Sequence, residues 1–338
     1  MVIKEAIGKL VDGSSLSEEE AAAVMDEIMT GEATPAQFGA FVTALRLKGE
    51  TVDEITGMAR VMREKALRVV VAGPLLDTCG TGGDHQGTFN VSTAAAFVCA
   101  GAGLRVAKHG NRAMTSACGS ADVLEALGAR IDLTPEQVAE CLERAGIGFM
   151  FAPAFHPAMK FAAGPRREIG VRTVFNILGP LTNPAGATAQ VLGVAEPSLA
   201  DKMAQVLGRL GCDHALVVHG EDGFDEVSIS GATQVWELTG GDVRRYKVEP
   251  SEMGLTPAEA HHVRGGSPEE NAATLRRVLS GEKGARRDFT LMNAAAGVAA
   301  GGKTATMAEG VALAAEAIDS GAAREALERF VSVSSSFG

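Results

Sequence analysis

The pattern of apolar residues changes near residue 69, and this change constrains the fold more than any other feature of the chain. Up to about Leu67, helix-start signals are followed by apolar residues three or four positions apart. After Val69, short apolar β-type runs alternate with helical stretches, which is typical of a parallel sheet with helices on both faces. We therefore predict an α/β protein with a small N-terminal all-α helical domain at residues 1–68 and a larger α/β domain at 69–338, built on a mainly parallel central sheet with flanking helices.

Capping chemistry predicts three short helices in the first domain, and the apolar pattern of Ile3–Val11 predicts a fourth. A Ser or Thr followed three residues later by Glu or Gln satisfies free N–H groups at a helix start. The predicted helix starts are Ile3, Ser17, Thr34 and Thr51. Their apolar faces are broad, so we expect part of one face to be covered from outside the segment, most simply by a second copy of the chain.

Seven apolar β-type runs are predicted to form the sheet. They are Leu75–Cys79, Leu104–Lys108, Ile147–Phe151, Gln190–Val194, Ala215–His219, Val235–Leu238 and Arg245–Val248. The helices of this domain are predicted to begin at Ser120, Thr134, near Ser198, and at Ser267, Leu291 and Thr306. Glycines and prolines between Gly164 and Gly186 predict a long irregular crossing, and the stretch at about 165–186 could contribute to the helical domain.

The charge balance limits the classes of partner. The chain has 31 Lys and Arg against 42 Asp and Glu, a net charge of −11, which argues against nucleic-acid binding and against docking on an anionic membrane. No apolar stretch reaches the roughly 20 residues that cross a bilayer. The five cysteines are widely spaced and include no C-x-x-C pair, as expected in a reducing compartment. We therefore expect a cytoplasmic protein that binds neither nucleic acid nor membrane.

A glycine-rich turn, Gly80-Thr81-Gly82-Gly83-Asp84, directly follows the first predicted strand. Ligands bind at this edge of a parallel sheet, and glycines let backbone N–H groups approach an anion closely. The turn does not have the dinucleotide-binding pattern, because His85 stands where its last glycine should be. Asp84 suits a metal or a sugar hydroxyl. The alternative is a tight strand-to-helix turn with no ligand.

Polar side chains gather at two further points. Thr88, Asn90, Ser92 and Thr93 crowd the start of an apolar helix. Free N–H groups at a helix start favour phosphate, although one hydroxyl could simply cap the helix. The segment Lys108-His109-Gly110-Asn111-Arg112 follows the second strand. In an acidic chain its cations fit a di- or triphosphate, and the alternative is an exposed turn.

Charged pairs occur at two other places. Asp225-Glu226 follow the strand Ala215–His219, and hard carboxylates suit Mg²⁺, although adjacent acids are also common on surfaces. Arg166-Arg167 lie near the predicted crossing and could hold a carboxylate in a fork or carry helix-end charge.

One nucleotide-binding pattern is rejected on its context. Residues 297–304 match G-x-x-x-x-G-K-[ST], but a P-loop requires a preceding strand. Here the preceding residues 291–296 have a helical pattern, with Gly301-Gly302 as the predicted helix end. The histidines form no recognisable triad, so no residue is assigned as a general acid or base.

Together these motifs resemble the anthranilate phosphoribosyltransferase family over nearly the whole chain. The resemblance rests on the order and spacing of Gly80–Asp84, Asn90–Thr93, Lys108–Arg112, Gly119–Gly128, His156–Lys160, Arg172–Pro184 and Asp225-Glu226. It implies a helical domain hinged to an α/β domain that binds 5-phosphoribosyl 1-diphosphate (PRPP), and a homodimer formed through the helical domain. The implied reaction transfers the 5-phosphoribosyl group from PRPP to the amine of anthranilate and releases diphosphate, the second step of tryptophan biosynthesis from chorismate.

The resemblance also implies the binding residues. PRPP would be held by Gly80, Gly83, Asp84, Thr88, Asn90, Val91, Ser92, Thr93, Lys108, His109, Gly110, Asn111, Arg112, Ala113, Met114, Thr115, Ser116 and Ser120. Anthranilate would contact Gly80, Asn111 and Arg166, with the arginine facing its carboxylate. Two Mg²⁺ ions per subunit would be held with the help of Ser92, Asp225 and Glu226.

The chain departs from the family in one segment. At Thr115-Ser116-Ala117-Cys118-Gly119 many relatives have Ser-Ser-Lys/Arg-Ser-Gly, and the loss of a cation and a hydroxyl could weaken PRPP binding. Two alternatives share the fold: a pyrimidine nucleoside phosphorylase, and a non-catalytic relative that binds nucleic acid. The net charge of −11 and the presence of Asn111 and Arg166 argue against the second alternative.

Overall fold

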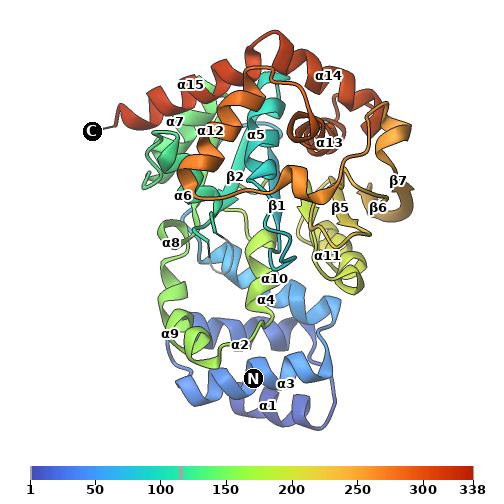
Figure 1. The fold of residues 1–338 in the computed structure, drawn as a ribbon. Coiled ribbons are helices and arrows are strands. Elements are labelled where there is room, and N and C mark those ends of the chain that lie inside the picture. Colours follow the sequence, from blue (N-terminus) through green and yellow to red (C-terminus); the bar gives the residue numbers. More distant parts are fainter. Residues whose placement is uncertain (1, 114–116, 338) are drawn as a thin grey trace.

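The computed structural model describes residues 2–113 and 117–337. A bundle of helices lies at one end of the molecule and an α/β domain at the other (Figure 1). Three of the predicted substrate-binding residues, Met114, Thr115 and Ser116, lie outside the described residues.

The bundle begins with the four predicted helices. They are α1 (Ile3–Val11), α2 (Glu18–Thr30), α3 (Pro35–Lys48) and α4 (Val52–Glu64). Ser17, Thr34 and Thr51 each accept a hydrogen bond from the backbone three residues later and form the predicted capping boxes. The short-range cap signals therefore located these helices correctly.

The seven predicted strands form one sheet with the order β3-β2-β1-β4-β5-β6-β7. Their bounds are β1 (Leu76–Gly80), β2 (Val106–Gly110), β3 (Ile147–Phe151), β4 (Ala189–Gly193), β5 (His214–Gly220), β6 (Thr233–Thr239) and β7 (Asp242–Val248). Neighbouring strands from β3 to β5 are parallel, whereas β6 and β7 are antiparallel. Gly240 and Gly241 both have positive φ, as a two-residue hairpin between β6 and β7 requires. The mainly parallel sheet is confirmed.

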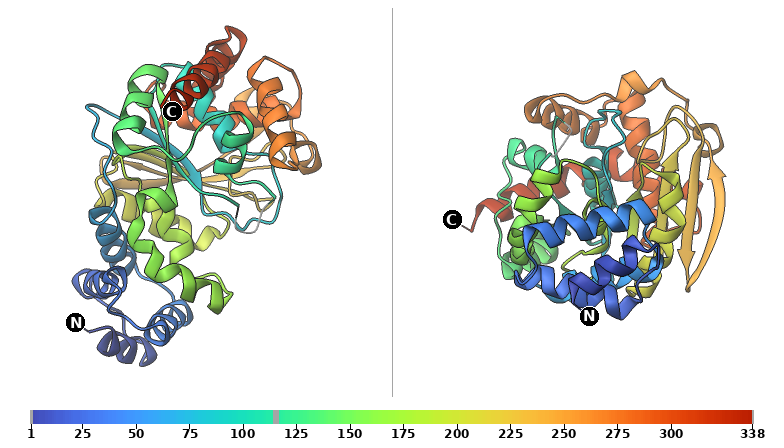
Figure 2. Two further views of the ribbon diagram at one scale, coloured as in Figure 1. Left: turned by 90° about the vertical axis from the view of Figure 1, so that its left-hand side faces the viewer. Right: turned by 90° about the horizontal axis from the view of Figure 1, so that it is seen from below.

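Helices cover both faces of the sheet (Figures 1 and 2). The elements after the bundle are α5 (Val91–Gly101), α6 (Ser120–Ala126), α7 (Pro135–Ala145), α8 (Ala152–Phe155), η1 (Pro157–Met159), α9 (Lys160–Ile169), α10 (Phe175–Leu178), η2 (Gly179–Leu181), α11 (Pro197–Arg209), η3 (Pro250–Met253), η4 (Ala260–Val263), α12 (Pro268–Leu279), α13 (Ala285–Ala300), α14 (Met307–Asp319) and α15 (Ala322–Ser335). On β5, Leu216 and Val218 enter the core that includes α5 and α13, whereas Val217 enters the core shared by α11 and the bundle. This alternation follows the two-residue period of a strand.

The predicted irregular crossing is wrong in part. Residues 160–169 form α9 although Pro165 lies inside it, and only one helical hydrogen bond is lost there because proline lacks an N–H. Figure 2 shows α9 and α10 alongside the bundle, and Ala162, Phe175 and Leu178 belong to the same buried cluster as the bundle helices. None of the helices in the described chain is long and apolar enough to cross a membrane.

Candidate active site

The carboxyl end of β1 lies at the point where the strand order reverses. β1 pairs with β2 on one side and with β4 on the other, and in open α/β sheets ligands bind at such a switch point. The glycine-rich turn begins in the last residue of β1, the Lys108 segment spans the end of β2, and the Asp225-Glu226 pair lies in the loop after β5. The fold thus brings three predicted motifs to one edge.

Two hydrogen bonds hold the glycine-rich turn, one to the end of β4 and one to the loop after β5. Thr81 N–H donates to the Gly193 carbonyl at 2.9 Å, and Gly82 N–H donates to Asp225 Oδ2 at 2.7 Å. Gly82 and Gly83 have φ of 64° and 83°, which residues with a side chain rarely adopt. A Cβ at Gly80 would lie 2.6 Å from Asp225 Oδ2, so glycine permits this close approach.

Acidic side chains gather beside the turn. Burial raises the pKa of Asp225, and the nearby Asp84 carboxylate raises it further. Burial and then Asp225 raise the pKa of Glu226 well above its usual range. Asp84 Oδ2 is buried without a hydrogen-bond partner. Lys108 opposes part of the shift at Glu226 but does not offset it, and a divalent cation would supply further positive charge.

The donor set suits Mg²⁺ better than a metal held by protein alone. Within residues 2–113 and 117–337, no group of three His, Cys, Asp or Glu side chains converges as a complete metal site. Mg²⁺ usually takes one or two protein carboxylates and completes its coordination with water and substrate phosphates. Asp225 and Glu226 could supply the carboxylates, with Ser92 as a hydroxyl ligand.

The start of α5 is not capped by a side chain. Asn90 is the N-cap residue, but it makes no capping hydrogen bond. Its amide instead donates to the Cys118 carbonyl at 3.0 Å and accepts from Asn271 at 2.9 Å. Thr93 Oγ1 is buried without a partner. Helix capping therefore does not explain the hydroxyls here, and the N–H groups at this helix start remain suited to an anion.

Lys108 connects its segment to this helix start. Its side chain is 2% exposed, and Nζ donates to the Thr78 carbonyl and to Ser92 Oγ, the latter at 3.3 Å. Burial lowers the pKa of Lys108, while nearby acids, Asp77 first, oppose that change. Lys108 therefore places a positive charge at the start of α5.

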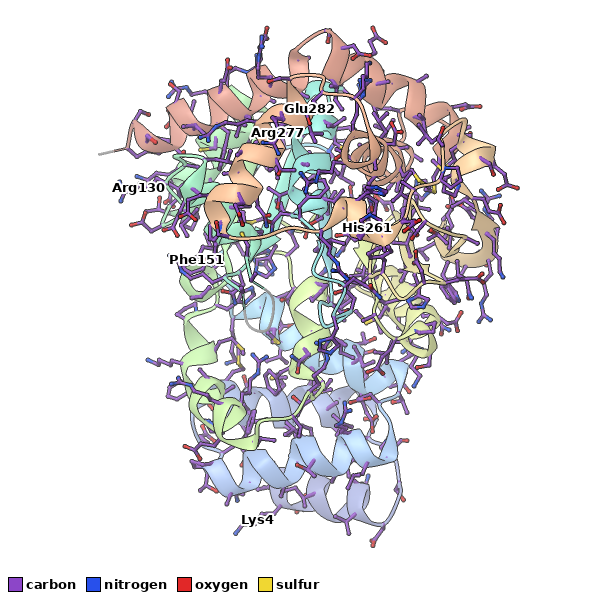
Figure 3. All side chains as sticks on the ribbon, viewed as in Figure 1. Lys4, Arg130, Phe151, His261, Arg277 and Glu282 are labelled. Atoms are coloured by element: carbon purple, nitrogen blue, oxygen red, sulfur yellow. The ribbon has the colours of Figure 1, made fainter. Side chains whose placement is uncertain are left out.

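The side chain of Arg112 pairs with acidic residues of α6 and not with the glycine-rich turn. Its guanidinium pairs with Asp122 at 3.1 Å and with both oxygens of Glu125 on α6. It also lies 5.5 Å from the ring centroid of Phe151, which is labelled in Figure 3. Asn111 is nearby, and its carbonyl accepts a hydrogen bond from Ser120 Oγ at 3.3 Å. The charge of Arg112 is thus neutralised by α6 in this structure.

The two adjacent arginines of α9 have different surroundings. The guanidinium of Arg166 lies 5.4 Å from the ring centroid of Phe175. Burial lowers the pKa of Arg166. Arg167 is exposed. The two side chains therefore do not form a fork, and Arg166 is the one available to a buried carboxylate.

The sequence did not predict the buried hydrogen bond between Asp77 on β1 and Asn183. Asn183 Nδ2 donates to Asp77 Oδ2 at 2.7 Å, and His109 N–H donates to Asp77 Oδ1 at 3.2 Å. Asp77 is fully buried. Its position inside an apolar strand was a signal that this carboxylate needs partners, but the sequence did not identify them.

A second missed feature is a pair of buried histidines. The ring centroids of His109 and His156 are 5.0 Å apart. His109 Nε2 and both ring nitrogens of His156 have no hydrogen-bond partner. Burial lowers the pKa of His109 to about 3 and that of His156 to about 4. Both rings are therefore neutral at pH 7 and offer polar atoms to a ligand.

Comparisons with known proteins agree with this geometry. Residues 72–324 match the glycosyl transferase family, a/b domain, and residues 4–66 match the helical bundle domain of the same family. An anthranilate phosphoribosyltransferase from Dehalococcoides mccartyi is 59% identical over 337 residues, covering 99% of each chain. One from Pelotomaculum thermopropionicum is 59% identical over 331 residues, covering 98% of this chain and 96% of the relative.

Solved structures of such enzymes are also similar to this chain. The crystal structure of anthranilate phosphoribosyltransferase from Thermus thermophilus has a TM-score of 0.92 at 51% identity and covers 97% of this chain and 98% of its own. The Saccharomyces cerevisiae enzyme in complex with PRPP and Mg has a TM-score of 0.91 at 31% identity, with coverage of 99% and 98%.

Proposed function

The chain belongs to the anthranilate phosphoribosyltransferase family, and from this premise we propose how its residues transfer the 5-phosphoribosyl group of PRPP to the amine of anthranilate. The observation that carries the proposal is the meeting of the glycine-rich turn, the uncapped start of α5, Lys108 and the Asp225-Glu226 pair at one sheet edge. In the pathway from chorismate to tryptophan this transfer is the second step.

PRPP binds across these loops. The Gly80–Asp84 turn and the N–H groups at the start of α5 face its anionic groups, and Lys108 adds a positive charge beside Ser92. The other PRPP contacts come from Thr88, Asn90, Val91, Thr93, His109, Gly110, Asn111, Arg112, Ala113, Met114, Thr115, Ser116 and Ser120. Arg112 must exchange its ion pairs with α6 to take part.

The metal site uses two Mg²⁺ ions per subunit, held by Ser92, Asp225 and Glu226 together with substrate oxygens. Mg²⁺, when bound, neutralises the charge that grows on diphosphate as the C1–O bond breaks. Lys108 and the backbone N–H groups of the turn stabilise the same developing charge. Closure of the bundle on the α/β domain excludes water that would otherwise hydrolyse PRPP.

Anthranilate binds beside Gly80, Asn111 and Arg166. Its amine is a neutral, weak nucleophile, so positioning and the electrophilic ribose carbon account for most of the rate. Arg166 is half-buried and burial lowers its pKa; a guanidinium in this setting suits a carboxylate ligand. No side chain is assigned as the base that takes the amine proton.

The chain forms a homodimer through its helical domain. Leu47 on α3 is 83% exposed and Val11 on α1 is 70% exposed, and both line one shallow cavity with Leu10 and Ala44. A second copy would cover this apolar surface. Sedimentation equilibrium should give a dimer for the wild type and monomers for Leu47→Asp. A wild-type monomer would contradict the proposed assembly.

The enzyme acts in the cytoplasm. No disulfide joins any of the cysteines at positions 79, 99, 118, 141 and 212, all of which lie in the described ranges. Such thiols persist in a reducing compartment.

One experiment separates the transferase from a pyrimidine nucleoside phosphorylase. Purified protein is given anthranilate, PRPP and Mg²⁺ in one arm, and thymidine with arsenate in the other. Loss of anthranilate fluorescence without thymidine cleavage supports the transferase. Thymidine cleavage with unchanged anthranilate fluorescence would favour the phosphorylase, and activity in neither arm would leave the nucleic-acid-binding alternative.

A further inference from the structure

Arg172 makes two contacts with the glycine-rich turn. It follows α9 in the connection to α10. Nη2 donates to the Thr81 carbonyl at 3.2 Å. The guanidinium also lies against the open side of Gly83, where an added Cβ would be 2.7 Å from Arg172 Cζ. Gly83 therefore leaves the space that the guanidinium occupies.

The charge of Arg172 is not neutralised by an ion pair. Among the residues that the structure describes, no carboxylate oxygen lies within 4.0 Å of its guanidinium nitrogens. The side chain is partly buried and lines a small cavity with Thr81 of the turn. Arg46 from α3 and the carboxylates Glu50 and Glu196 line the same cavity, but neither carboxylate forms an ion pair with Arg172. A guanidinium that contacts a loop carbonyl and forms no direct ion pair keeps donors available to an anion on that loop.

The same segment extends into the bundle. Thr173 N–H donates to Asn176 Oδ1 at 2.9 Å, which fixes the turn after Arg172. Phe175 then packs 5.2 Å from the ring of Phe38 in α3. The packing of Phe175 on Phe38 fixes the backbone that carries Arg172. Arg172 can therefore hold the glycine-rich turn in one position.

We propose that Arg172 is a positioning residue for PRPP: it fixes the Gly80–Asp84 turn through Thr81 and Gly83, and its positive charge stabilises diphosphate on that turn. This role rests on the proposed function, because it requires the diphosphate of PRPP to bind there. It differs from the role of Arg166, which contacts the other substrate.

The test compares the two substrates in Arg172→Ala. Because the variant loses a hydrogen-bonding group that faces a charged ligand, the KM for PRPP should rise roughly tenfold or more. The KM for anthranilate, measured at saturating PRPP, should stay within about twofold. Calorimetry with magnesium diphosphate alone should show the same weakening. Millimolar guanidinium should restore part of the loss, because it replaces the missing group.

Two further variants keep the test decisive. Arg172→Lys retains the charge without the planar fork and should fall between wild type and Arg172→Ala. Arg324→Ala on α15 removes only an exposed pairing with Glu328 and should leave both KM values unchanged. If Arg172→Ala does not fold, Arg172→Lys must still raise the KM for PRPP selectively.

Two results would overturn the role. The first is a KM for PRPP within about twofold of wild type in the folded variants, and the second is an equal rise of both KM values, which would indicate general damage. A wild-type protein that binds neither PRPP nor magnesium diphosphate would instead contradict the proposed function itself.

Discussion

The backbone N–H of Gly82 donates a hydrogen bond to Asp225 Oδ2 at 2.7 Å, across 143 residues of sequence. Asp225 thereby holds the glycine-rich turn and also stands next to Glu226 in the acidic pair. The glycine-rich turn and the proposed metal-binding carboxylates are thus physically linked at the sheet edge. A change in either should affect the binding of both PRPP and Mg²⁺.

Asp225→Asn and Glu226→Gln should each lower kcat about 10²-fold, because each removes a charge that holds the cation at the leaving group. Initial rates measured against Mg²⁺ concentration should also show half-maximal activity at higher Mg²⁺. Glu221→Gln is the control, since Glu221 is exposed and pairs with Lys247. An unchanged Mg²⁺ requirement in both variants would contradict the assigned metal site.

Lys108→Met should separate activity from stability. The variant loses the buried charge beside Ser92, so kcat/KM for PRPP should fall about 10²–10³-fold. Stability should be retained or raised, because the lysine is buried without a carboxylate in contact and its desolvation is costly. Rates and thermal unfolding check the two expectations. A stable variant with wild-type kinetics would remove Lys108 from the site.

Arg166→Ala should raise the KM for anthranilate by roughly tenfold or more, since an arginine–carboxylate hydrogen bond is charge-assisted. The KM for PRPP should change little. The neighbouring Arg167 is exposed, and Arg167→Ala provides a comparison on the same helix. Equal effects of the two variants on anthranilate would show that no specific carboxylate contact exists.

The buried histidines give a spectroscopic prediction. Burial lowers the pKa of His109 to about 3 and of His156 to about 4, so ¹⁵N NMR should show both rings neutral from pH 5.5 to 8. In the urea-unfolded chain both should titrate near pH 6.5. Between about pH 6.5 and pH 4 only the unfolded chain takes up protons at these two histidines. The stability that the neutral rings contribute is therefore fully present above about pH 6.5 and is lost as the pH falls toward 4. A ring protonated at pH 6 in the folded protein would disprove this assignment.

Glu237 should make folding sensitive to acid. Burial alone would raise the pKa of Glu237, but hydrogen bonds with His214, Arg244 and Tyr246 outweigh it and lower the pKa to about 2. Its stabilisation is therefore present above the unfolded pKa of about 4.3 and is lost as the pH falls toward 2. Urea unfolding of Glu237→Gln should show a deficit at pH 7 that shrinks by pH 3. The exposed Glu32→Gln should show none, and a deficit independent of pH would exclude the ionic explanation.

Local signals in the sequence predicted most of the fold. Helices with side-chain caps were located to within a residue or so, as at Thr134 and Ser267. The last helix, α15, was not predicted: its N-cap is Gly321, with no side-chain hydrogen bond to mark the start. In α9, Pro165 suggested an irregular segment, but packing of Ala162 against the bundle offsets the lost hydrogen bond.

The candidate site was predictable where its residues follow one another along the chain. Gly80–Asp84 and Lys108–Arg112 each stand at a strand end, and the sheet brings them together. The contacts of Asp77 with Asn183 and of Arg172 with Thr81 join residues 106 and 91 positions apart. No local period or cap encodes such pairs, so they emerge only from the folded chain.

Transfer of the 5-phosphoribosyl group must consume one anthranilate for each diphosphate released, and the most direct measurement follows both in one reaction. Wild-type protein is incubated with anthranilate, PRPP and Mg²⁺, with anthranilate followed by fluorescence and diphosphate by a coupled assay, and the reaction is repeated with EDTA. We expect one diphosphate released for each anthranilate consumed. With EDTA we expect neither diphosphate release nor loss of anthranilate fluorescence. Diphosphate release while anthranilate fluorescence persists would mean hydrolysis of PRPP, and it would contradict the transfer.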